Sequence, residues 1–339
     1  MSWRLMLCGL AVAAAVPAAA FAQVGDTIYV QRGSPIRGTV SAMSPDEVTV
    51  DSPAGQRKVD VNDIKYIVYQ DEPNGLTAGR TAVVQKNFNQ AVNDLKAATS
   101  DREVIKQDIA FYRALALAKL AMGEGGDKAA AEAAMKAFAG AGRGSYHFYE
   151  AAETLGDLAM TSGKYEDAAK YYRPIIANGG KHPEAQLRAR LANGRALEGL
   201  KKYDEAIAAY KEVTDAGNAS PEAKTLAEVG QASCMAATGK AAEAIKMLEG
   251  VIEKNDPQDS DLFAKTYVAL GNAYQKADKP KEALMAYLHV DMLYYAEADA
   301  HAESLFHLSK LWDKVNRADR AIAARNTLRE RYNGSVWAQ

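Results

Sequence analysis

Five side chains of metal-binding type lie near the C-terminal end of the sequence: His289, Asp291, His301, Glu303 and His307. Histidine nitrogens and carboxylate oxygens could together hold a transition metal. On helices, however, residues two or six apart point in different directions, and this applies to the pair 289/291 and to the pair 301/307. The alternatives are a metal site and ordinary surface or packing residues. We favour the second and expect no metal.

Other catalytic motifs are missing from the sequence. It has no Walker loop, HExxH, GxSxG or paired CxxC. We therefore expect no catalytic residues, no cofactor and no enzymatic activity; an enzyme fused to another module has almost no support. The aromatic runs Tyr146–Tyr149 and Tyr294–Tyr295 could form a ligand platform, but helical spacing favours packing. Cys234 is predicted to be a buried structural thiol.

Composition bounds the class of protein. The chain has 339 residues, 48% hydrophobic and 25% charged, with a formal net charge of −2. Such a composition is ordinary for a globular protein, and the length suggests about two domains. A near-neutral surface cannot displace many counterions from phosphates, so we expect no nucleic-acid partner.

The first residues have the pattern of a secretory signal. Arg4 precedes an apolar stretch at 5–16, Pro17 follows, and Ala20-Phe21-Ala22 places small residues before a cut at Gln23. The apolar stretch is shorter than the ~20 residues that span a membrane. We predict a cleaved signal peptide at 1–22 and a protein exported to the periplasm or cell envelope. The alternative is a segment retained as a short anchor.

Residues 24–70 carry strand signals. Five short runs, for example Thr27–Val30 and Glu47–Asp51, alternate apolar and polar residues and are separated by Pro and Gly turns. Curling into a barrel would remove the exposed edges of so small a sheet. With the run Ile36–Val40 and the closing run Val61–Ile67, the region resembles small SH3-like or Sm-like barrels. We predict a five-stranded β-barrel domain at 23–72, with no ligand assigned.

From Leu76 onward the sequence is helical and repeats. Four segments, 163–168, 201–206, 239–244 and 278–283, consist of a turn and a first helical turn with an acidic residue, and each ends in alanine. These alanines are spaced 38, 38 and 39 residues apart, and further copies end near Ala91, Ala131 and Ala321. Such a period means one supersecondary unit stacked many times. About seven helix pairs account for a domain at 73–339.

The repeated unit resembles the tetratricopeptide repeat. That family carries Leu-Gly and Tyr in its first helix, and Ala with a later aromatic in its second. The matching residues of the clearest copy are Tyr267, Leu270, Gly271, Tyr274, Ala283 and Tyr287; the others include Gly156 with Tyr172 and Gly194 with Tyr210. Small glycines would let helices approach, and the tyrosines would fill the wedge between pairs. The usual period is 34 rather than 38, and the longer repeats resemble those of bacterial envelope proteins.

The resemblance implies a mainly α fold, an α-solenoid whose first helices line a concave face. Matching to the family pattern places ten polar residues on this face as candidate partner-binding residues: Glu150, Glu153, Asp157, Arg188, Arg195, Lys265, Asn272, Lys276, Lys310 and Lys314. An acidic end near Glu153 and a basic stretch from Arg188 to Lys276 would suit an extended peptide of mixed charge.

Two functions remain open. The first is a non-catalytic scaffold of the bacterial envelope that binds other proteins or peptides on the concave face. The alternative is a periplasmic protein that binds a small molecule or a peptidoglycan fragment. The sequence does not name the partner or the oligomeric state.

Overall fold

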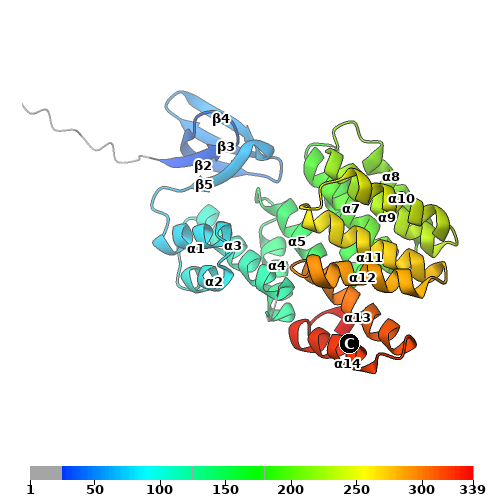
Figure 1. The fold of residues 1–339 in the computed structure, drawn as a ribbon. Helices are drawn as coiled ribbons and strands as arrows, with labels where there is room; N and C mark the ends of the chain where they lie inside the picture. Colours follow the sequence, from blue (N-terminus) through cyan, green and yellow to red (C-terminus); the bar gives the residue numbers. More distant parts are fainter. Residues whose placement is uncertain (1–24, 124–125, 179, 339) are drawn as a thin grey trace, which may run out of the picture.

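The computed structural model describes residues 25–123, 126–178 and 180–338. The predicted signal peptide at 1–22 lies outside them. Figure 1 shows a small sheet at the N-terminal end, followed by a curved array of helices that runs to the C-terminus. No helix within these described residues combines the length and apolar character that a bilayer crossing requires.

The sheet is antiparallel and has five strands: β1 (Asp26–Val30), β2 (Ile36–Met43), β3 (Glu47–Ser52), β4 (Gly55–Asp60) and β5 (Ile64–Val68). Their order is β4-β3-β2-β1-β5, so β4 and β5 form opposite edges. The five predicted strands are therefore present, but the prediction of a closed barrel is wrong.

The sheet stays open because helices cover its apolar side. A 3₁₀ turn, Val61–Asp63, carries the chain from β4 to the far edge, where β5 pairs with β1. Ile28 and Ile67 of the sheet are fully buried and belong to one hydrophobic cluster with Leu76 and Phe111 of the helices. The Arg80 guanidinium also donates a hydrogen bond of 2.5 Å to the Ile67 carbonyl oxygen. Burial against helices thus replaces closure of the sheet on itself.

Helices occupy the rest of the described chain as seven consecutive hairpins. They are α1 (Asn74–Val84) with α2 (Phe88–Lys96), α3 (Glu103–Met122) with α4 (Lys128–Ala141), α5 (Phe148–Thr161) with α6 (Tyr165–Ile176), α7 (Pro183–Gly199) with α8 (Tyr203–Thr214), α9 (Pro221–Ala237) with α10 (Ala241–Lys254), α11 (Ser260–Lys276) with α12 (Pro280–Leu293), and α13 (Ala298–Lys314) with α14 (Ala318–Arg331).

Outside the pair α3–α4, the turn inside each hairpin is built in one way. A residue with positive φ follows the first helix at equivalent positions, among them Gly163, Lys201, Gly239 and Asp278. The next backbone N–H then bonds a carbonyl five residues back, as from Lys202 to Leu197 at 2.9 Å. This left-handed cap satisfies carbonyl groups that the helix end leaves free. The repeat in the sequence is therefore a repeat of turn geometry.

Glycines and tyrosines set the spacing between helices. Tyr172, Tyr210 and Tyr287 are almost completely buried. A Cβ built on Gly194 would lie 2.6 Å from the ring of Tyr210, and only a glycine leaves this room. Tyr210 is contacted equally closely by Gly230 of the next hairpin. The close approach expected from the repeat pattern is confirmed, and the tyrosine does fill the wedge between hairpins.

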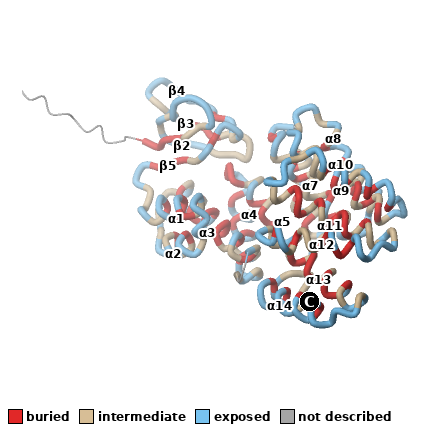
Figure 2. Tube along the Cα trace, in the orientation of Figure 1, coloured by how far each residue is buried: buried red, intermediate tan, exposed pale blue. Residues whose placement is uncertain are grey.

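The first helices of the hairpins form the inner layer of the array. Successive first helices contact one another directly, from α3 and α5 through to α11 and α13, whereas second helices have no comparable contacts. Buried residues, red in Figure 2, lie where neighbouring helices face each other. We call the surface carried by α5, α7, α9, α11 and α13 the inner face.

Candidate functional site

All ten predicted partner-binding residues lie on first helices. Glu150, Glu153 and Asp157 are on α5, and Arg188 and Arg195 are on α7. The remaining five are on the last two first helices: Lys265, Asn272, Lys276, Lys310 and Lys314. The structure thus brings residues from four hairpins to one layer.

Glu153 and Arg188 are joined in a two-pronged ion pair between neighbouring helices. The Nε and Nη2 atoms of Arg188 donate to the two carboxylate oxygens of Glu153 at 2.9 and 3.0 Å. The hydrogen bond to Glu153 raises the pKa of the Arg188 guanidinium. This fork geometry fixes both side chains on the surface of the inner face.

Asp157 and Asn272 follow the packing glycines at equivalent repeat positions, and both bind the wedge tyrosine. The Tyr172 hydroxyl donates to Asp157 Oδ1 at 2.9 Å, and the Tyr287 hydroxyl donates to Asn272 Oδ1 at 2.6 Å. Burial raises the pKa of the Asp157 carboxyl. These hydrogen bonds tie the inner-face residues to the buried tyrosines. The polar residues of the inner face therefore recur with the same spacing as the packing glycines and tyrosines.

Arg195 occupies the same repeat position but makes no such bond. Its side chain is exposed, and no hydrogen bond or ion pair holds it within the described part of the chain. Burial among surrounding protein atoms lowers its pKa, but Asp299 of α13 and Asp261 of α11 act on it electrostatically and raise the pKa overall. Charges on helices two and three hairpins away reach Arg195 because the layer is curved.

Two carboxylates complete the inner face: Glu198, which sequence reasoning missed, and Glu303, which it considered only as a candidate metal ligand. Glu198 accepts hydrogen bonds from the hydroxyls of Ser233 and Tyr210. Glu303 accepts one from Asn272 Nδ2 at 3.0 Å, and burial raises its pKa to about 7. Burial likewise raises the pKa of Glu198. Glu198 lies four residues after Gly194, one helical turn along the same face, and this spacing could have revealed it.

Basic and acidic residues are mixed on the inner face, whereas the sequence suggested an acidic end and a basic stretch. Arg188 is paired with Glu153, and Lys265 with Asp261 at 2.5 Å. The Lys310 ammonium lies 3.7 Å from the centre of the Phe306 ring. Glu150, Lys276 and Lys314 are exposed, and the structure does not bring the two lysines into a hydrogen bond or ion pair with another described residue. The basic stretch is therefore interrupted by carboxylates.

The histidine and carboxylate group singled out in the sequence divides into separate contacts. His301 is buried and contacts Asp291 and the Tyr332 hydroxyl, each at 2.8 Å. His307 stacks on Tyr287, and burial together with Lys310 lowers its pKa to about 4. Among the described residues, no three side chains of ligand type gather in a way that could hold a metal ion.

The end of the last hairpin returns to the third one. The Lys128 ammonium donates to the Thr161 carbonyl and to the Gly334 carbonyl, both at 2.8 Å. Val336 packs against Gly163 at the turn between α5 and α6. Burial raises the pKa of Tyr165, the first residue of α6, and the nearby carboxylates of Glu303 and Asp299 raise it further. These contacts close the curve and surround part of the inner face.

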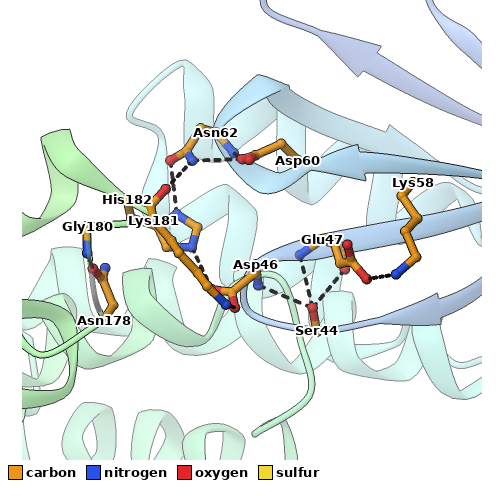
Figure 3. A network of polar contacts seen from close by, with 10 residues as sticks. All are labelled: Ser44, Asp46, Glu47, Lys58, Asp60, Asn62, Asn178, Gly180, Lys181 and His182. Atoms are coloured by element: carbon orange, nitrogen blue, oxygen red, sulfur yellow. Dashed lines mark hydrogen bonds and ion pairs between the residues drawn. The ribbon is translucent and has the colours of Figure 1, made fainter.

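The sheet also contacts the helical array through a network of polar side chains, drawn in Figure 3. Asp46 accepts from the Lys181 ammonium at 2.6 Å and contacts His182 Nε2 at 3.1 Å. Asn62 contacts the other ring nitrogen of His182 at 2.9 Å and donates to the Lys181 carbonyl at 2.8 Å. A pocket beside Lys181 is lined by Asp46, Glu47, Lys58 and Asp60.

Comparisons with known proteins agree with this geometry. Residues 153–221 and 191–260 match the sequence profile of the tetratricopeptide repeat. No curated protein matches the chain significantly.

Several solved structures share the fold. A tetratricopeptide repeat protein from Parabacteroides merdae is 15% identical, with a TM-score of 0.58 over 76% of this chain and 92% of that one. A Rap protein complexed with competence and sporulation factor is 11% identical, with a TM-score of 0.56 over 78% and 76%. NprR in complex with its cognate peptide NprX is 15% identical, with a TM-score of 0.50 over 76% and 77%. At these identities the likeness concerns the fold, which is a tetratricopeptide-like solenoid preceded by an open five-stranded sheet.

Proposed function

We propose that this protein is an exported, non-catalytic scaffold of the bacterial envelope that binds an extended segment of a partner protein on its inner face. The observation that carries the proposal is the state of Arg195. Its guanidinium is exposed in the curved layer, faces carboxylates on other hairpins, and is held by no hydrogen bond or ion pair within the described residues. A charged group placed in this way is available to a partner.

The surrounding polar groups support an extended ligand. Asp157, Asn272 and Glu303 are fixed by hydrogen bonds to tyrosines or to one another. Side chains held in one geometry lose little entropy on binding, which favours a face that is already organised. Two of the structures with the same fold were solved with competence and sporulation factor or with the peptide NprX.

Site-specific photocrosslinking in the native cell tests the proposal. A crosslinking amino acid at Arg195 or Asn272 should give adducts with the same protein, because both positions lie on the inner face. Lys170 and Lys211 lie on second helices and are exposed, so they serve as controls. Adducts formed only from the control positions would refute binding on this face.

Charge reversal gives a second test with the partner so identified. Reversing Arg188, Arg195 and Lys276 together should weaken partner capture. Because Arg188 is paired with Glu153, the swap Glu153→Arg with Arg188→Glu keeps that ion pair and shows whether its polarity matters. A small-solute binder would instead purify without a partner and gain thermal stability with its ligand. That result would favour the alternative function.

Export has its own test. If residues 1–22 are a signal peptide, the protein isolated from the envelope fraction begins at Gln23. Intact-mass spectrometry measures this start directly. A chain that keeps its first residues and stays in the cytoplasm would remove the envelope from the proposal and leave the binding face as it is.

A further inference from the structure

Helix α12 carries an exposed apolar stripe on the outer side of the array. Met285, Met292 and Leu293 are 56%, 69% and 63% exposed, and Tyr295 just after the helix is 52% exposed. We call these four residues the α12 patch. Single exposed apolar residues are common, but three large ones on one helix, with a fourth just beyond its end, are not.

The neighbouring repeats show that this composition is particular to α12. The alanine register places Met285, Met292 and Leu293 opposite Lys246, Glu253 and Lys254 of α10, which are exposed and charged. The corresponding residues of α14 are Ala323, Glu330 and Arg331. All three positions are charged in α10, and α14 has an alanine and two charged residues there, so neither neighbour carries a large apolar side chain at them. The fold itself does not require apolar residues there.

The rest of α12 offers little to solvate this side. Its acidic and basic residues are Lys281 and Glu282 in the first turn, then His289, and Asp291 near the end. The His289 ring stacks on Tyr267, and its Nδ1 lies 2.8 Å from the Met285 carbonyl oxygen. Asp291 already contacts His301 at 2.8 Å. A helix that is apolar on both sides is normally covered on both sides. One side of α12 packs in the array, so the other side needs a partner.

We infer that a second copy of this chain covers the α12 patch, with the two α12 helices antiparallel about a two-fold axis. Met285 and Met292 are seven residues apart, and half-buried Leu288 lies between them, which is the spacing of a helix–helix seam. A two-fold contact uses the same surface twice, and this stripe carries no net charge that would repel its copy. The inference does not depend on binding at the inner face.

The flanking charges fit this arrangement. Lys246 and Glu253 on α10 occupy the repeat positions of Met285 and Met292, so they share the same midpoint along the helix direction. An antiparallel two-fold contact therefore places Lys246 of one copy near Glu253 of the other. Given the exposed fractions of its four residues, the patch presents on the order of 500 Å² per copy, so that two copies together reach the ~1,000 Å² needed for a specific interface.

Sedimentation velocity on the full chain, over a range of concentrations, tests the inference. The wild type should pass from monomer to dimer at micromolar concentrations. Met285→Lys with Met292→Lys should raise the dissociation constant at least tenfold while circular dichroism and Tm stay unchanged. As a matched control, Ala208→Lys with Asp215→Lys changes the equivalent positions on α8 and at its C-cap and should leave dimerisation intact.

A charge swap tests the antiparallel geometry. Lys246→Glu should weaken the dimer, because it places like charges together, and adding Glu253→Lys should restore it. A wild type that remains monomeric up to ~100 μM, as it would if a different protein covered the patch, overturns the inference. A dimer unaffected by the double methionine variant overturns it as well, and failure of the swap to restore association rejects the antiparallel arrangement.

Discussion

Gly271 of α11 lies directly against the ring of Tyr287 in α12, so that a Cβ on the glycine would come within 2.6 Å of the tyrosine Cζ. The ring cannot move aside easily, because it is fully buried and its hydroxyl is bonded to Asn272 and Gln275. We predict that Gly271→Val lowers the free energy of unfolding by about 1–3 kcal/mol through overpacking. Urea denaturation followed by circular dichroism measures this change.

Gly250 is the matched control for that substitution. It lies inside α10, and a Cβ there would meet no atom within 4 Å. Gly250→Ala should leave stability unchanged or raise it by up to about 1 kcal/mol, because alanine favours the helix. Equal destabilisation by the two variants would contradict the packing role of Gly271 against Tyr287.

Glu303 should make stability depend on pH. Burial raises its pKa from 4.5 to about 7, so the folded chain binds this proton more tightly than the unfolded chain. The stabilisation is therefore complete below pH 4.5 and is lost as the pH rises toward 7. Glu303→Gln should match the wild type near pH 4 and exceed its unfolding free energy by up to about 3 kcal/mol at pH 8.

His307 acts in the opposite direction over part of that range. Its pKa is lowered from 6.5 to about 4, so its contribution to stability is complete above pH 6.5 and is lost as the pH falls. The pH profile of the wild type alone would combine the two effects. Equilibrium unfolding of Glu303→Gln and wild type at each pH isolates the carboxyl; a constant difference across pH 4–8 would contradict its raised pKa.

Lys128 should hold the C-terminal end in place. Its ammonium bonds the carbonyls of Thr161 and Gly334, which are otherwise far apart in the sequence. Lys128→Met removes both bonds and should cost about 1–3 kcal/mol of local opening free energy. Hydrogen exchange of residues 332–338 should accelerate accordingly. Lys136→Met on the same helix removes a surface ion pair with Glu132 but no contact to the C-terminal residues, and it should leave that exchange unchanged.

His182 should anchor the sheet to the helices. It is 4% exposed, and its two ring nitrogens contact Asn62 and Asp46. His182→Ala removes one polar contact from each of these partners, although both keep their bonds to Lys181. It should lower the unfolding free energy by about 1–2 kcal/mol. Lys181→Ala removes an exposed ammonium from the same carboxylate and should have a smaller effect. Thermal unfolding of both variants shows which of them loses more stability. A larger loss in Lys181→Ala than in His182→Ala would contradict a role for His182.

Most of the fold, namely the stack of helical hairpins, could be predicted from the sequence repeat. Alanines at constant spacing, acidic first turns and glycine–tyrosine pairs are local requirements of one hairpin, so they could be read in the sequence. The closed barrel was predicted wrongly, because short alternating strands do not reveal what covers their apolar side. Ile67 and Leu76 share one core in the structure, and such a contact between different elements leaves no periodic signal.

The sequence predicted which residues lie on the inner face, but not their pKa values or their hydrogen bonds. Arg195 and Asn272 could be placed because they follow the packing glycines. The chemistry of Glu303 could not be predicted, because its raised pKa depends on burial in the stack and on the charges of Glu198 and Arg195 in α7, three hairpins earlier. The bond from Asn272 to Glu303 likewise joins two helices whose facing sides are fixed only by stacking.

The contact between Lys128 and Gly334 also sets a limit on how such a chain can evolve. An open stack of hairpins tolerates the gain or loss of one unit, since each unit touches only its neighbours. Here the seventh hairpin must arrive beside the third, and Val336 must meet Gly163. A duplicated or deleted hairpin would carry the C-terminal residues past this meeting point. The number of units is therefore fixed by a fit between distant parts of the chain, as in a ring of set size.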